Sequence, residues 1–93
     1  MRLTIIKDDN KIVVDGIPKI IDISDIQPPN FHALQWEGPQ DGTGGDGEIE
    51  FTGKPKPVNE EITDLGDYYQ YYLLWVNTPL QVDPSPLDYL TNP

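Results

Sequence analysis

Short runs of alternating apolar and polar residues fill the first part of the chain, and this pattern predicts β-strands. The first three runs are residues 2–7, 11–15 and 19–23, which are rich in isoleucine and valine. Two aspartates and an asparagine at 8–10 separate the first two runs, and these residue types suit tight turns. We therefore expect the first two runs to pair as a β-hairpin, with the third run as another strand.

Two further runs flank a glycine-rich segment. Residues 31–37 and 48–52 alternate in the manner of strands, with Ile49 and Phe51 of the second run facing the core. In the first run, strict alternation places Phe31 on the side opposite Trp36, and the size of Trp36 favours its side as the core face. The segment between the two strands holds five of the eight glycines, so we expect a mobile hairpin loop that does not pack.

The spacing of apolar residues changes to a helical one beyond a proline-rich segment at 53–57, which we expect to be an extended linker. Residues 64–76 place most of their aromatic side chains along one face of a helix. Thr63 or Asp64 can cap its start, and the Asn-Thr-Pro run at 77–79 ends it. Aromatic and branched side chains at 68–76 would also suit a strand, but the capping residues favour the helix.

These elements predict an α+β fold: a small antiparallel sheet of four to five strands with one C-terminal helix. Residues 1–78 form a single domain in this interpretation, and the proline-rich residues 79–93 form an extended or disordered tail. The apolar run at the N-terminus is too short for a signal peptide or a membrane span. The chain has no cysteine, which fits a reducing compartment.

The charge is strongly acidic, with 6 basic against 16 acidic residues and a net charge of −10. Beyond Lys56 the chain has no basic residue. Direct binding to nucleic acid or to an anionic membrane is therefore not expected, because both need lysine and arginine. A basic protein partner, a divalent cation or simple solubility is compatible with this charge.

The sequence offers little catalytic chemistry, and we expect no enzyme and no cofactor. His32 is the only histidine, and it is interpreted as a partly buried strand residue. Acidic side chains around the glycine-rich loop, from Asp41 to Glu50, suggest calcium, but they lack the spacing of a known calcium loop. Solvated loop carboxylates are the favoured interpretation there, and no metal or catalytic residue is assigned.

The densest feature of the C-terminal part is its aromatic cluster, which serves either as the core face of a helix or as a docking surface for a partner protein. The second interpretation follows because a chain of 93 residues has a limited core in which to bury aromatic rings. Apolar residues of the tail would extend such a surface. The candidate partner-binding residues are Tyr68, Tyr69, Tyr71, Tyr72, Trp75, Leu87, Tyr89 and Leu90.

The order of several segments resembles a group of small proteins of tailed bacteriophages, encoded among virion and tail genes. The resemblance rests on residues 3–7, 14–16, 31–38, 47–51 and 59–64, with a distinctive Gln-Trp-Glu-Gly core at the end of the third segment. The glycine loop is longer here, and the proline-rich tail differs. The resemblance implies a bacteriophage context and transfers no catalytic residue.

Two functions follow as hypotheses. The first is a non-enzymatic protein-binding module, a minor virion or tail component or an assembly factor, whose partners are phage structural or assembly proteins or a second copy of the chain. The second is an acidic inhibitor of a host nucleic-acid-binding protein, in which carboxylates occupy a basic groove. Either function places the chain in the host cytoplasm, and the first also allows the virion.

Overall fold

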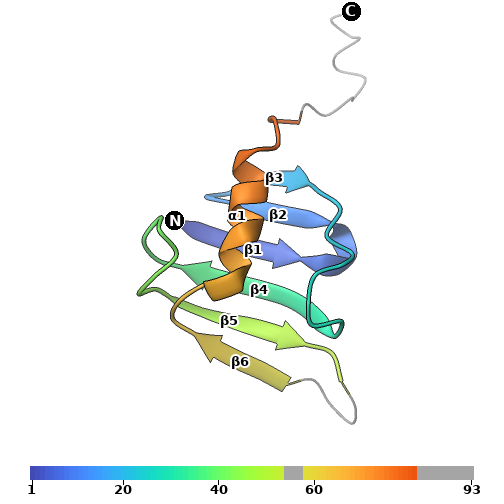
Figure 1. The fold of residues 1–93 in the computed structure, drawn as a ribbon, viewed down its shortest axis with the longest axis vertical. Coiled ribbons are helices and arrows are strands. Elements are labelled where there is room, and N and C mark those ends of the chain that lie inside the picture. The colour runs from blue at the N-terminus through green and yellow to red at the C-terminus, as the bar shows by residue number, and fades with distance from the viewer. Residues whose placement is uncertain (54–57, 82–93) are drawn as a thin grey trace, which may run out of the picture.

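The computed structural model describes residues 1–53 and 58–81, in which one helix covers one face of a six-stranded antiparallel sheet (Figure 1). The strand order is β3-β2-β1-β4-β5-β6. The α+β class is thus confirmed, but the sheet has six strands where four to five were expected. The elements are β1 (Arg2–Ile6), η1 (Lys7–Asp9), β2 (Lys11–Val14), β3 (Ile17–Ile20), β4 (Phe31–Glu37), β5 (Asp46–Phe51), β6 (Val58–Ile62), η2 (Gly66–Tyr68) and α1 (Tyr69–Val76).

Two tight turns connect the first three strands and make them antiparallel neighbours. Asn10 adopts a left-handed conformation (φ 48°) and ends η1, and β1 pairs with β2 as the sequence predicted. Asp15 and Gly16 both have positive φ (50° and 86°), so they form a two-residue hairpin turn between β2 and β3. This turn fixes the start of β3 at Ile17, two residues before the predicted strand.

A register shift in β4 explains how Phe31 and Trp36, which strict alternation places on opposite sides, both reach the core. The pairing of β4 with β5 slips between Phe31 and Ala33. A bulge of this kind turns a side chain to the other face of a strand. Phe31 therefore reaches the core together with Leu34 and Trp36, and all three are buried.

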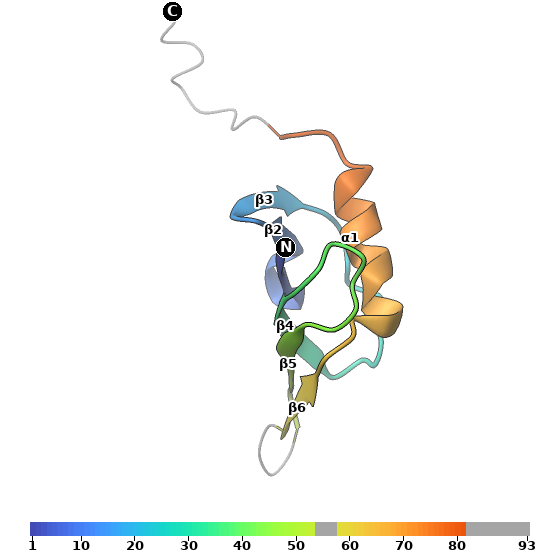
Figure 2. The ribbon, with the colours of Figure 1, turned by 90° about the vertical axis from the view of Figure 1, so that its left-hand side faces the viewer.

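The core lies between the sheet and α1. Its strand residues come mainly from β1, β2 and β4, while the connection between β3 and β4 adds Ile23 and Ile26. In Figure 2 this connection and the loop between β4 and β5 lie on the same side of the sheet as α1. The buried apolar residues are Leu3, Ile5, Ile12, Val14, Ile23, Ile26, Phe31, Leu34, Trp36, Ile49, Leu65 and Tyr72.

The glycine-rich loop was expected to be unpacked, and the structure corrects this expectation. Its backbone packs where side chains would not fit: Gly42 lies against the ring of Tyr69, and Gly45 lies against the ring of Trp36. The Gly45 amide donates to the carbonyl of Thr63 (2.8 Å), which also accepts the indole N–H of Trp36 (2.8 Å). The loop is thus fixed to the segment that leads into the helix.

The helix is shorter than the sequence predicted, with η2 in front of it and no side-chain hydrogen bond capping its start. The Asp64 carboxylate, expected as a cap, instead accepts the amide N–H of Gly44 (2.7 Å). The predicted end holds, since α1 stops at Val76 before Asn77. Residues 68–76 are therefore mostly helix and not a strand.

The far face of the sheet carries no described segment of the chain (Figure 2). Ile49 of β5 is buried on the helix side of the sheet, so alternation places its neighbours Glu48 and Glu50 on the open face. Glu61 of β6 pairs with Glu48 and lies on the same face. Glu48 stands opposite Glu61, and Glu37 stands opposite Asp46. Like charges in facing positions destabilise a sheet. The β4–β6 part of this side is therefore acidic, with Arg2 of β1 as the basic residue opposite Glu37.

Candidate partner-binding surface

The aromatic residues of α1 and η2 hold the helix on the sheet. Tyr72 is buried, while Tyr68, Tyr69, Tyr71 and Trp75 are partly buried against the core. From the sequence we expected all five to bind a partner protein, together with Leu87, Tyr89 and Leu90, which lie outside the described residues. Partner binding by these residues stays a prediction. In the described part of the chain, the five aromatic side chains bury much of their surface against the core.

Hydrogen bonds from the ring polar groups tie the helix to three different segments. The Tyr68 hydroxyl donates to the carbonyl of Gln27 (3.1 Å), and the Tyr69 hydroxyl donates to that of Gln40 (3.3 Å). The indole N–H of Trp75 donates to the carbonyl of Ile17 in β3 (3.0 Å). These bonds orient the helix, which then presents its remaining side chains outward.

In the described part of the chain, the most exposed large apolar residues are aliphatic, and four of the six lie in α1 or just beyond its end. Leu73, Leu74 and Val76 in the helix are 44%, 38% and 48% exposed, and Leu80 just beyond it is 69% exposed. In β3, Ile17 and Ile20 are also largely exposed. The side chain of Ile20 lies on the open face of the sheet, because the neighbouring Lys19 is buried on the helix side, so we call the other five residues the helix-end surface. Groups of exposed aliphatic side chains of this kind mark sites of protein interaction more often than single exposed ones do.

Side-chain contacts bring the two parts of the helix-end surface together. The Lys19 ammonium donates to the carbonyls of Trp75 (2.8 Å) and Thr78 (2.5 Å) and lies 3.8 Å from the centre of the Trp75 ring. The amide of Gln81 both donates to and accepts from the backbone of Ile20. Because of these contacts, β3 and the end of α1 are neighbours.

The same contacts close the edge of the sheet at β3. Pro18 has no N–H to offer, and the backbone groups of Ile20 are bonded to Gln81. An edge strand whose outward backbone groups are already bonded or absent offers few hydrogen bonds to a further strand. The helix-end surface is therefore suited to side-chain docking and not to extension of the sheet.

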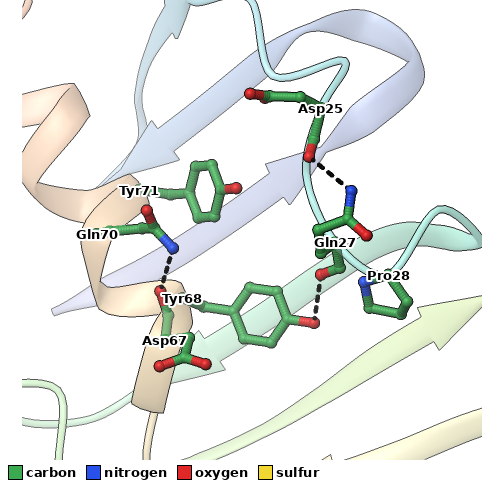
Figure 3. A pocket seen from close by; sticks show the side chains of 7 residues that line it. All are labelled: Asp25, Gln27, Pro28, Asp67, Tyr68, Gln70 and Tyr71. Carbon is green, nitrogen blue, oxygen red and sulfur yellow. Dashed lines mark hydrogen bonds between the residues drawn. The ribbon is translucent and has the colours of Figure 1, made fainter.

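An open pocket of about 660 Å³ lies at the other end of the helix, between η2 with the start of α1 and the connection from β3 to β4 (Figure 3). Burial raises the pKa of Tyr68, and Glu60, Tyr71 and Asp67 raise it further. Burial likewise raises the pKa of Tyr71, with Asp25 adding to the effect. Both hydroxyls thus stay neutral at physiological pH. The lining residues are Asp25, Gln27, Pro28, Asp67, Tyr68, Gln70 and Tyr71.

The residues considered for metal or acid–base chemistry are not assembled into a site. His32 is a half-exposed residue of β4 whose Nδ1 lies 3.7 Å from an Asp8 oxygen. In the loop, Asp41 accepts hydrogen bonds from the amide and hydroxyl of Thr43, and these bonds lower the pKa of its carboxyl. Among the described residues no three acidic or histidine side chains are grouped to hold a metal ion.

None of the individual residues named from the sequence as partner-binding belongs to the helix-end surface. The adjacent Leu73 and Leu74 fall outside the aromatic stripe, and this displacement from the core face is the signal that could have indicated them. Ile17 could not be assigned to the surface without the position of the β2–β3 turn.

Comparison of the chain with models of known protein families, with curated proteins and with solved structures found no match. Among residues 1–53 and 58–81, no helix has the length and apolar character needed to cross a membrane.

Proposed function

We propose that this chain is a non-enzymatic protein-binding module of a tailed bacteriophage, acting as a minor virion or tail component or as an assembly factor. The helix-end surface is the observation that carries the proposal. A small domain that has only a limited core nevertheless leaves Leu73, Leu74, Val76 and Leu80 exposed in one region. The transfer of such side chains from water into an interface is favourable, at about 25 cal/mol per Å² of apolar surface.

The bacteriophage part of the proposal comes from the resemblance of the β-strand segments and the Gln-Trp-Glu-Gly core at 35–38. The partners are phage structural or assembly proteins or a second copy of this chain. Its place of action is the host cytoplasm during assembly, or the virion for a structural component.

The proposal predicts that the double variant Leu73→Gln/Leu74→Gln loses its partner. Glutamine has a helix propensity close to that of leucine, so the helix should persist while the apolar area is removed. We expect at least a tenfold drop in the partner recovered with tagged protein from infected cells, measured by quantitative mass spectrometry. For self-association, light scattering after size-exclusion chromatography would show the same loss.

The matched control is Glu48→Gln/Glu61→Gln, which changes two facing side chains on the open face of the sheet. Partner recovery should be unchanged in this control. Equal recovery by the wild-type chain and the leucine variant would contradict the proposal.

A second function, acidic inhibition of a host nucleic-acid-binding protein, is favoured by the concentration of acidic side chains on the β4–β6 part of the open face. The facing pairs Glu48–Glu61 and Glu37–Asp46 present carboxylates in rows on β4 to β6. A basic groove would relieve their repulsion. This function reverses the outcome of the experiment above: the glutamate variant would lose its partner, raised salt would release it, and the leucine variant would retain it.

A further inference from the structure

We propose that the pocket shown in Figure 3 binds the guanidinium group of an arginine side chain from the partner protein. This inference deepens the proposed function and rests on it for the identity of the ligand as part of a protein. The pocket lies at the start of α1, whereas the helix-end surface lies at its end, so the two sites can be tested separately.

The walls of the pocket offer ring faces. The rings of Tyr68 and Tyr71 are tilted by 34°, with their centres 6.4 Å apart. Tyr68 is fixed by its hydroxyl bond to Gln27 and by contact with Phe31, whose ring centre lies 5.4 Å away. A guanidinium group is planar and weakly hydrated, so it stacks on such rings more readily than an ammonium group does.

The polar groups of the pocket are turned so that they offer acceptors. The side-chain amide of Gln27 donates to the carbonyl of Asp25 (3.2 Å), and that of Gln70 donates to the carbonyl of Asp67 (3.0 Å). A carbonyl can only accept, so each amide turns its NH₂ group toward that backbone carbonyl and leaves its oxygen as an acceptor. The hydroxyl of Tyr68 likewise donates its hydrogen to the backbone carbonyl of Gln27, so toward a ligand it can only accept.

Two carboxylates lie at opposite ends of the ring pair. In Figure 3 Asp25 lies on the Tyr71 side of the pocket and Asp67 lies beside Tyr68. Each of these carboxylates raises the pKa of the tyrosine beside it, in addition to burial. Within the described part of the chain, neither carboxylate lies within 4 Å of a basic side chain, because the single contact of that kind there joins Asp8 and His32.

Ring faces, amide oxygens and carboxylates together suit a ligand that is cationic, planar and rich in donors. The guanidinium group has five N–H donors and a permanent charge, so it can use all three kinds of group at once. None of the lining residues is basic. Lys7 donates to the carbonyl of Pro29 next to the pocket, but it is not part of the lining.

The test uses the labelled protein and nuclear magnetic resonance, with the peptide acetyl-Gly-Arg-Gly-amide as the probe. We expect saturable shifts of backbone amides at 25–27 and 67–71. The neutral isostere, in which citrulline replaces arginine, should bind at least tenfold more weakly. The absence of shifts at millimolar peptide, or equal binding of the citrulline peptide, would overturn the inference.

Variants separate a built site from general attraction between charges. The double variant Asp25→Asn/Asp67→Asn should weaken arginine binding about tenfold. The control Glu48→Gln/Glu61→Gln changes the net charge equally on the open face of the sheet, opposite to the side that carries the pocket, and should leave binding unchanged. An equal loss in both double variants would overturn the inference.

Asp67 precedes α1, where a carboxylate also favours the helix. The single variant Asp25→Asn lies in a connection between strands and avoids this complication, and it should weaken binding about threefold. An unchanged affinity in this variant would count against the pocket.

The leucine variant Leu73→Gln/Leu74→Gln should bind the arginine peptide as the wild type does. If the peptide fails to bind while that variant still loses its partner, the pocket inference is wrong and the proposed function stands. If the peptide binds while the leucine variant keeps its partner, the pocket binds arginine and the helix-end surface is not the docking site of the proposed function.

Discussion

Replacement of Gly45 by alanine should lower the free energy of unfolding by about 3 kcal/mol, the largest effect that we expect from adding a single methyl group. A Cβ atom at this position would meet the ring of Trp36 and would lie 2.5 Å from the carbonyl oxygen of Glu37. The backbone oxygen cannot move without disturbing β4, and Trp36 is fully buried. The loop or the ring must therefore shift.

The consequences of that shift extend to the helix. The Gly45 amide and the Trp36 indole both donate to the Thr63 carbonyl, and the next residues lead into η2 and α1. Displacing the loop therefore weakens the attachment of the helix. Urea denaturation measures the loss, and the melting temperature should fall by more than 10 °C for a domain of this size.

The neighbouring Gly44 provides the control for this prediction. It has φ +66°, and a Cβ atom there would meet nothing within 4 Å. Asparagine tolerates this left-handed conformation, so Gly44→Asn should cost less than about 1 kcal/mol. If Gly45→Ala were no more destabilising than Gly44→Asn, the packing of the loop on Trp36 would be refuted.

Replacement of Lys19 by methionine should lower the free energy of unfolding by about 2 kcal/mol, since hydrogen bonds from charged groups contribute about 1.5–3 kcal/mol. The Lys19 side chain is buried, and its ammonium donates to the carbonyls of Trp75 and Thr78 at the negative end of the helix dipole. Methionine keeps the apolar stem and removes the charge. The cation–π contact with Trp75 is lost as well.

Lys11→Met is the matched control, because Lys11 belongs to the adjacent strand β2 and is only partly buried. It should change stability by less than about 0.5 kcal/mol. Hydrogen exchange should show faster opening of residues 73–78 in the Lys19 variant alone. Equal stability of the two lysine variants would show that Lys19 does not hold the end of the helix.

The parts of the fold that could be predicted are those in which side chains alternate or break in a regular way. The pairing of β1 with β2, the bounds of β4 and the end of α1 at Val76 all belong to this group. Their signals are local: branched strand residues, a turn cluster and a proline after the helix.

The parts that could not be predicted depend on contacts distant in the sequence. Strand β6 has the sequence Val-Asn-Glu-Glu-Ile, whose two glutamates are tolerated only because the strand lies at the sheet edge. The bulge that turns Phe31 inward needs the partner strand to reveal it. The role of Lys19 requires the helix end to lie over β3, which no spacing in the sequence indicates.

The candidate surfaces also divide into features that the sequence indicates and features that depend on distant contacts. The aromatic cluster was found from its composition, but the structure shows that its rings are partly or fully buried against the core. The glycine-rich loop carries no side-chain pattern, so its packing through the backbone was invisible. The pocket brings Asp25 beside Tyr71 from segments 46 positions apart, and only the fold joins them.

Site-directed photo-crosslinking in infected cells tests most directly whether the end of α1 is the docking surface. A photoreactive phenylalanine analogue is placed at Leu74 in one version of the chain and at Gln35, an exposed residue of β4, in another. The account predicts a discrete crosslinked product of higher mass from position 74 and none from position 35. Crosslinking from position 35 alone, or from neither position, would contradict it.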